Sequence, residues 1–221
     1  MKPILFNTER VRSILEGRKT VTRRAIRPQP EGRPIRMTEN SCYPGCYAIE
    51  GTPRVIRPPC QSGDTLWVRE TWQYAYDMDG NDQPIEETGR YLYAADGPEP
   101  FNYWIMPDGT HRDHMPWRPS IHMPREAARL FLRVTGVRVE RLKDIDGHGI
   151  LKEGIDNGKS NPAMGTRWGN MQSMAFAELW DNTVKPEDRA TYGWEANPWV
   201  WVIEFERIGK DEALGGGGDA N

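Results

Sequence analysis

The chain has 221 residues, of which 37% are hydrophobic and 28% are charged, and its formal net charge is −3. This balance excludes an intrinsically disordered polyanion and a histone-like polycation. No apolar run reaches the roughly 18 residues of a membrane-spanning helix, and the first residues are too briefly apolar for a secretory signal. We therefore expect a cytoplasmic protein that does not associate with a membrane.

Basic residues are unevenly distributed along the chain. Between Glu9 and Arg36 there are nine Lys or Arg residues and three Glu residues, whereas the stretch from Glu187 to Asn221 is acidic. A local basic cluster on a net acidic protein indicates an anionic ligand held at one place, and an ordinary solvated basic face is the alternative.

The three cysteines are Cys42, Cys46 and Cys60. An odd, small number favours free thiols in a reducing compartment over a disulfide framework. A zinc site completed by a histidine is the alternative, although structural zinc sites usually show tighter paired spacing. We predict neither a metal nor another cofactor.

The predicted elements begin with a helix over residues 8–15. Thr8 is its expected N-cap, and apolar residues recur at helical spacing from Val11. Gly17 fits the C′ position, so the chain turns there and leads directly into a basic segment. The proline-rich segment 28–62 has few periodic apolar positions and is predicted to be a loop.

Strong β formers predict a strand over residues 65–72, which follows a Gly-Asp turn. Residues 77–118 are rich in Asp, Gly and Pro, and we interpret them as an insertion or lid with one strand-like patch at 91–93. Pro124 favours a short helix over residues 125–128.

A long bent strand is predicted over residues 130–142. Its apolar residues fall on even numbers up to Val134 and on odd numbers from Val137. The switch at Thr135-Gly136 indicates a β-bulge, which inserts one residue and bends the strand. A long bent strand favours a barrel over a flat sheet.

Two further elements complete the predicted fold. Residues 170–181 are expected to form an amphipathic helix, and residues 199–205 a strand whose apolar face is core rather than a base-stacking platform. Residues 210–221 are predicted to be a flexible tail. Together the elements predict an α+β fold: a mixed β-barrel with flanking short helices, in a single domain over 1–209 with a long loop insertion at about 77–118.

One short segment combines a potential base, two hydroxyl nucleophiles and two cations: Lys19-Thr20-Val21-Thr22-Arg23-Arg24. A neutral lysine can take the proton of a hydroxyl, which requires a lysine pKa well below its usual value of about 10.4. Burial and neighbouring positive charge both lower such a pKa. In a regular strand Lys19 and Thr22 would point to opposite faces, so they can meet only if the chain turns. Exposed basic residues at a strand start are the alternative.

Five blocks of the sequence resemble the ASCH domain family, a relative of the PUA RNA-binding domains. Their order and spacing follow that family over about half of the chain. The blocks are residues 16–24 (EGRKTVTRR), 63–68 (GDTLWV), 130–142, 151–155 (LKEGI) and 199–205 (WVWVIEF). Residues 117–124 and 197–201 are similar in detail to the longer ASCH proteins of phages and prophages.

The resemblance implies a PUA-like barrel with a cleft that accepts a base or nucleoside. Bacterial ASCH enzymes hydrolyse the amide of N4-acetylcytidine and related N4-acylated cytosines with a Lys, a Thr three residues later and a distant Glu. Lys19, Thr22 and Glu153 match these three by position. Arg24 also matches the family, whereas Arg23 stands where short members often have an apolar residue. The predicted insertion is absent from the short members.

An amidohydrolase acting on N4-acylated cytosine nucleosides or bases is the function that this resemblance implies. Neutral Lys19 would deprotonate Thr22, whose hydroxyl attacks the acyl carbonyl, while Glu153 positions Lys19 or relays protons. In the alternative scheme Lys19 and Glu153 activate water, and Thr22 binds the carbonyl.

Substrate binding is assigned to Arg24, Trp67, Glu70, Ser120 and His122. Trp67 could stack on a pyrimidine, and core packing is its alternative. Ser120 as a helix cap and His122 as a packed side chain are the alternatives for that pair.

A small nucleoside or base is the expected partner, on a monomer or weak dimer, with Trp104 at the mouth of the pocket. Two other functions fit the same residues: a non-catalytic module that binds single-stranded RNA, and a ribonuclease. A nucleoside hydrolase needs a closed pocket, whereas an RNA binder needs a long open basic groove.

Overall fold

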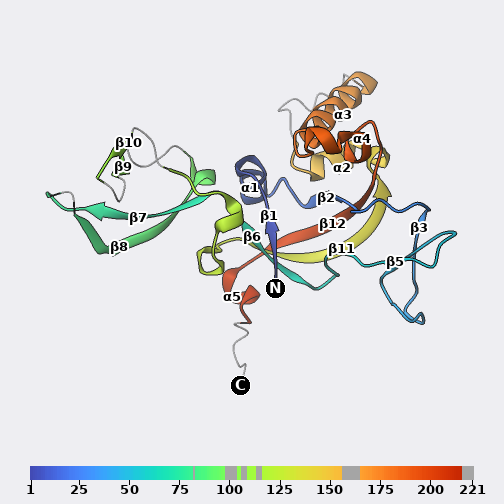
Figure 1. The fold of residues 1–221 in the computed structure, drawn as a ribbon, viewed down its shortest axis with the longest axis horizontal. Coiled ribbons are helices and arrows are strands. Elements are labelled where there is room, and N and C mark those ends of the chain that lie inside the picture. Colours follow the sequence, from blue (N-terminus) through green and yellow to red (C-terminus); the bar gives the residue numbers. More distant parts are fainter. Residues whose placement is uncertain (82, 98–103, 106–108, 113–115, 156–164, 216–221) are drawn as a thin grey trace. The chain divides into compact units, whose positions relative to one another are not determined.

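The protein is described by a computed structural model that covers residues 1–221 apart from 82, 98–103, 106–108, 113–115, 156–164 and 216–221. The chain forms two compact units (Figure 1). Unit 1 comprises Met1–Leu15, Thr65–Leu132 and Ile208–Asn221, and unit 2 comprises Glu16–Asp64 and Arg133–Arg207. The predicted single domain over 1–209 spans both units and stays a prediction.

The elements of each unit are short. Those of unit 1 are β1 (Lys2–Leu5), α1 (Thr8–Leu15), β6 (Thr65–Arg69), β7 (Trp72–Met78), β8 (Pro84–Tyr93), η1 (Ala94–Asp96), β9 (Trp104–Ile105), β10 (His111–Arg112), η2 (Ser120–His122), η3 (Arg125–Ala127) and α5 (Lys210–Ala213). Those of unit 2 are β2 (Val21–Ala25), β3 (Pro34–Arg36), β4 (Tyr47–Ile49), β5 (Val55–Ile56), η4 (Leu142–Asp144), α2 (Gly147–Lys152), α3 (Gly165–Asp181), η6 (Pro186–Asp188) and α4 (Arg189–Tyr192). Strand β11 (Phe131–Arg141) begins in unit 1 and continues in unit 2. Strand β12 (Trp199–Ile208) belongs to unit 2 except for its last residue, Ile208, which belongs to unit 1.

The first helix of unit 1 confirms the predicted span and corrects its cap. Helix α1 buries Val11 and Ile14 and is followed by Gly17, whose φ of 74° is the left-handed conformation expected after a helix end. The N-cap is Asn7 rather than Thr8, because the Arg10 N–H donates to Asn7 Oδ1 at 3.0 Å. Asparagine at this position satisfies an amide that the first helical turn leaves without a partner.

A hairpin occupies part of the segment that was expected to be a loop. The strand predicted over 65–72 ends at Arg69, and β7 begins at Trp72 and pairs with β8 in antiparallel register (Figure 1). The strand-like patch predicted at 91–93 is confirmed as the end of β8. The rest of the hairpin was not predicted, because the segment's Asp, Gly and Pro residues mask an aromatic cross-strand pair. Tyr74 lies opposite Tyr91 with ring centroids 4.8 Å apart.

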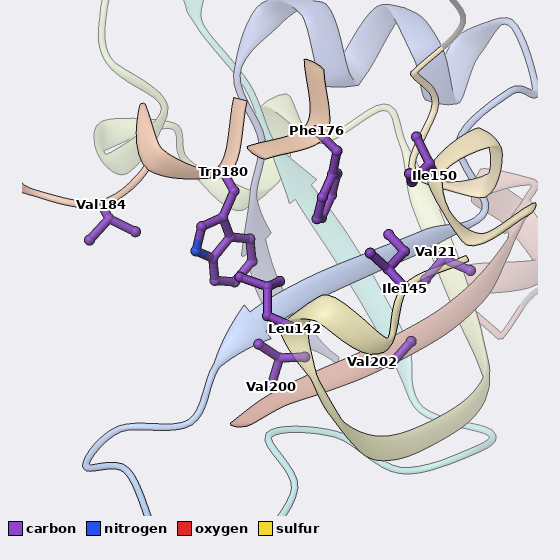
Figure 2. Packing of buried hydrophobic residues seen from close by; sticks show 9 residues of the cluster. All are labelled: Val21, Leu142, Ile145, Ile150, Phe176, Trp180, Val184, Val200 and Val202. Atoms are coloured by element: carbon purple, nitrogen blue, oxygen red, sulfur yellow. The ribbon is translucent and has the colours of Figure 1, made fainter. Parts of the chain in front are cut away.

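In unit 2 the strand order is β11-β12-β2, and β12 and β2 are antiparallel. Thr22 is opposite Ile203, and Arg23 is opposite Val202. Helix α3, which confirms and extends the helix predicted over 170–181, covers one face of this sheet. Figure 2 shows Trp180 of α3 pointing toward Leu142. The shared core consists of Val21, Leu142, Ile145, Ile150, Phe176, Trp180, Val184, Val200 and Val202.

The other face of β12 also carries apolar side chains. Trp201, Ile203 and Phe205 are buried, as predicted for a core strand. Tyr47 packs edge-on against Trp201, with ring centroids 5.4 Å apart. Tyr47 belongs to β4, which pairs with β3 and β5 in a small sheet, so the segment 28–62 is not all loop.

Mixed sheets and short helices confirm the α+β class. Among the described residues the strands do not close into a barrel. Among those same residues, no helix is long and apolar enough to cross a membrane.

Candidate functional site

The candidate site of unit 2 forms where the chain enters β2. After Gly17 the backbone turns, and Lys19 forms an isolated antiparallel bridge with Glu153, the C-cap of α2. The Thr20 N–H donates to the Lys152 carbonyl at 2.9 Å, and the Thr20 carbonyl accepts from the Phe205 N–H at 2.9 Å. Backbone pairing on both sides therefore fixes Lys19 beside Glu153.

Lys19 lies inside the protein, with its side chain 0% exposed. Its Nζ donates to Glu153 Oε2 at 2.6 Å, to the Val21 carbonyl at 2.6 Å and to the Glu153 carbonyl at 3.1 Å. Three oxygens match the three N–H bonds of an ammonium group. A buried lysine that is paired with a carboxylate is a candidate for proton transfer, because it can lose a proton where arginine cannot.

Arg23 contacts the other oxygen of the same carboxylate. Its Nη1 donates to Glu153 Oε1 at 3.3 Å, and its Nη2 donates to Glu140 Oε2 at 3.2 Å. Lys19, Val21 and Arg23 alternate along the chain, so Lys19 and Arg23 approach Glu153 from the same side of β2.

Thr22 lies between Lys19 and Arg23 in sequence but does not share their contacts with Glu153. It is 1% exposed, and its buried Oγ1 has no hydrogen-bond partner within the described part of the chain. Strand alternation places its side chain on the face of Ile203, opposite that of Arg23. Among the described residues no hydrogen bond joins the Thr22 hydroxyl to Lys19, so the structure pairs Lys19 with Glu153 and not with Thr22.

The site is one end of a series of six alternating charges, which we call the charge series. Arg138 contacts both Glu140 and Glu204, so the contacts continue outward from Arg23. In order, the series is Lys19, Glu153, Arg23, Glu140, Arg138 and Glu204. Three acids and three bases alternate, which compensates the cost of burying charge at the inner end.

Helix α2 is shaped to accommodate this series. Asp146 caps it by accepting the Gly149 N–H at 2.7 Å. A Cβ at Gly149 would lie 3.2 Å from Arg23 Nη2 and 3.1 Å from Asp146 Oδ1. A glycine in the first turn therefore gives the guanidinium room against the helix.

The predicted substrate-binding residues fall in both units, and each unit is described by itself. Arg24 lies half-buried on β2 of unit 2, and the other four belong to unit 1. Trp67 is 9% exposed in the core of unit 1, with the Arg69 guanidinium 5.5 Å from its ring. Ser120 is half-buried in η2, and His122 is exposed at its end.

Glu70, the fourth residue in unit 1, has both carboxylate oxygens occupied. Arg129 donates from Nε to Oε1 at 3.0 Å and from Nη2 to Oε2 at 2.9 Å. Burial raises the pKa of Glu70, and the hydrogen bonds and charge of Arg129 offset part of the rise. The Arg129 guanidinium also lies 3.8 Å from the Tyr93 ring centroid, and burial raises the pKa of Tyr93 to about 12.

Sequence reasoning did not identify Arg23 and Glu140 as part of the site. The signal for Arg23 was its departure from the family pattern, a second arginine where an apolar residue is usual. The side chain of Trp104 lies outside the described residues. Cys46 and Cys60 are buried and Cys42 is exposed, and within the described part of the chain no three His, Cys, Asp or Glu side chains cluster as a metal site would require.

Comparison of this chain with protein-family models, with curated proteins and with solved structures found no match.

Proposed function

We propose that the protein is an amidohydrolase of the ASCH type, with a PUA-like core, that cleaves the N4-acyl amide of N4-acetylcytidine and related N4-acylated cytosine nucleosides or bases. The observation that carries the proposal is the buried Lys19–Glu153 pair. Thr22 follows Lys19 by three residues, and its buried hydroxyl has no hydrogen-bond partner among the described residues. A buried polar atom without a partner in a native structure calls for an explanation, and a bound ligand supplies one.

The chemistry needs one proton acceptor, one oxygen nucleophile and one proton donor. The Lys19–Glu153 pair accepts the proton of the nucleophile, which is the Thr22 hydroxyl or a water. That oxygen forms a bond to the acyl carbon, the bond from the acyl carbon to N4 breaks, and the proton passes to the leaving amine. Where the oxygen is that of Thr22, a water then hydrolyses the acyl-threonine ester, which releases the carboxylate and restores the hydroxyl. Overall, one water and the amide yield cytidine and a carboxylate.

The described contacts favour the scheme in which the pair activates water. Lys19 Nζ is turned toward Glu153 and the Val21 carbonyl, and no hydrogen bond connects it with the Thr22 hydroxyl. In that scheme Thr22 donates its hydroxyl hydrogen to the substrate carbonyl. Catalytic hydrogen bonds often tighten only when substrate binds, so the Thr22 nucleophile remains the second form of the same proposal.

The basic segment near the N-terminus gives less support to an extended RNA groove. Many of its cations already donate to carboxylates or backbone carbonyls of the protein. These are Arg12, Arg18, Lys19, Arg23 and Arg27. Cations engaged in this way release few counterions on binding a polyanion, so a small neutral nucleoside fits better than an RNA strand. We propose the cytoplasm as the place of action and a monomer or weak dimer as the active form.

The test is incubation with N4-acetylcytidine, following the ultraviolet change as cytidine forms and measuring the acetate released. Thr22→Ala should lower turnover at least about 100-fold while substrate still binds. Thr20→Ala is the matched control, since Thr20 is exposed and only its backbone is bonded. No acetate from the parent protein, or equal turnover in both variants, would reject the proposal. Cut RNA without acetate would indicate a ribonuclease.

A further inference from the structure

Arg23 is a buried cation at the centre of the site, and the proposed chemistry does not use it. Its side chain is 3% exposed and contacts Glu153 on one side and Glu140 on the other. Within the residues that the structure describes, its buried Nε has no hydrogen-bond partner, and the contacts of the guanidinium with Glu153 and Glu140 are made by its two Nη atoms. A charged side chain buried this completely is retained only when its surroundings compensate for lost hydration.

The contacts of Arg23 divide the Glu153 carboxylate between two cations. Oε1 accepts from Arg23 and Oε2 accepts from Lys19. With one oxygen fixed, the carboxylate cannot rotate about its terminal bond without breaking a contact. The second oxygen therefore stays directed at the lysine.

The charge of Arg23 acts on the same pair. A nearby cation disfavours proton binding at a lysine and at a carboxylate alike, whichever of the two carries the proton. Glu140 lies on the far side of Arg23 and carries the opposite charge, so its effect on the pair has the opposite sign. Glu140 is itself also bonded by Arg138, at 2.5 Å between Arg138 Nε and Glu140 Oε1.

We propose that Arg23 is a positioning residue for the Lys19–Glu153 pair, which it orients through Glu153 and whose proton affinity it lowers. The proposal rests on the proposed amidohydrolase activity, since it assigns the pair a role in proton transfer. Gly149 is part of the same device, because a larger residue there would crowd Arg23.

The experiment compares three variants by the pH profile of kcat/KM for N4-acetylcytidine. Arg23→Met removes the cation and should move the rising limb to higher pH by about one unit. Glu140→Gln removes an anion and should move it to lower pH by a smaller amount. Arg23→Lys restores a cation and should return the limb toward the parent position. If Arg23 had a purely structural role, Arg23→Met and Glu140→Gln would lower kcat/KM without moving the rising limb of the pH profile in opposite directions.

A second readout is independent of activity. The same protein is labelled with carbon-13 at glutamate carboxyl groups, and the Glu153 signal is assigned with Glu153→Gln. Its titration without substrate should shift upward in Arg23→Met and downward in Glu140→Gln. If the parent does not hydrolyse the substrate but these shifts occur, the proposed function fails, and the effect of Arg23 on the proton affinity of the Lys19–Glu153 pair stands.

Two outcomes would overturn the proposal. One is an Arg23→Met variant that folds and titrates within about 0.2 units of the parent, since the cation would then not influence the pair. The other is a shift of the same sign in Arg23→Met and Glu140→Gln. Glu140→Gln keeps the test open if Arg23→Met fails to fold, because an unchanged titration in Glu140→Gln also contradicts the proposal.

Discussion

Each unit of the molecule buries a glutamate against a cation, and the two pairs differ in what the cation can do. In unit 1 one guanidinium covers both oxygens of Glu70, and Arg129 remains 27% exposed. In unit 2 Glu153 is divided between Lys19 and Arg23, and all three side chains are at most 4% exposed. The bidentate pair fixes geometry, whereas the divided pair contains a cation that can lose its proton.

Removing the lysine should have the largest effect on stability. Lys19→Met removes the lysine partner of the buried Glu153 carboxylate, and we expect a loss of about 3 kcal/mol in the free energy of unfolding. Arg129→Met should lose about 1–2 kcal/mol, because water can reach part of the space that Arg129 leaves. Urea denaturation of both variants measures the difference. Equal losses would mean that leaving Glu153 without Lys19 costs no more free energy than leaving Glu70 without Arg129.

Exchanging lysine and arginine keeps the positive charge of each pair but changes whether the cation can lose a proton. The exchange therefore distinguishes a cation that only holds its glutamate in place from one that takes part in proton transfer. Lys19→Arg retains a positive charge but offers a group that does not deprotonate in proteins, so the proposed hydrolysis of N4-acetylcytidine should fall about 100-fold or more. Arg129→Lys, the reverse exchange in unit 1, should leave turnover within about threefold of the parent. A Lys19→Arg enzyme that keeps full turnover would reduce Lys19 to an electrostatic role.

Thr22 permits a test in which stability and activity move in opposite directions. Thr22→Val replaces a buried hydroxyl that has no partner by a methyl group of similar size, so the variant should gain about 1 kcal/mol in stability while losing activity. Thr20→Val changes an exposed residue and should stay within about 0.5 kcal/mol. Thermal unfolding measures both. A destabilised Thr22→Val would indicate that the hydroxyl already has a partner.

The smallest expected effect lies in unit 1 at alkaline pH. The folded protein raises the pKa of Tyr93 to about 12, so it favours the neutral phenol. The stability that this contributes is complete below the ordinary tyrosine pKa of about 10 and is lost as the pH rises through about 12. The difference in unfolding free energy between the parent and Tyr93→Phe should therefore narrow by less than about 1 kcal/mol over that range, after solvent screening. A constant difference would contradict the assignment.

Local patterns in the sequence predicted the elements whose apolar residues repeat regularly. Helix α1, strand β11, helix α3 and the buried side of β12 all carry such repeats. The hairpin of β7 and β8 escaped because its pairing depends on aromatic residues facing each other across two strands. The Asn7 cap was missed because the threonine that follows it is also a favoured N-cap residue.

The candidate site also depends on contacts between distant residues, which local sequence patterns do not reveal. Lys19 and Glu153 are 134 residues apart, and only the family resemblance suggested that they meet. Arg23 could not be linked to Glu153 from the sequence, because that contact depends on which face of β2 is covered by α2. The buried, unpartnered state of the Thr22 hydroxyl is likewise a property of packing.

The charge series has a consequence for the response to salt. Its outer members Arg138 and Glu204 have side chains 43% and 37% exposed, whereas Lys19 is 0% exposed. Dissolved ions screen exposed charges over a Debye length of about 8 Å at physiological ionic strength and reach buried pairs far less. Rising ionic strength therefore weakens the contacts on β11 and β12 first, and the lysine keeps its carboxylate under conditions that would release a ligand held by surface charge alone.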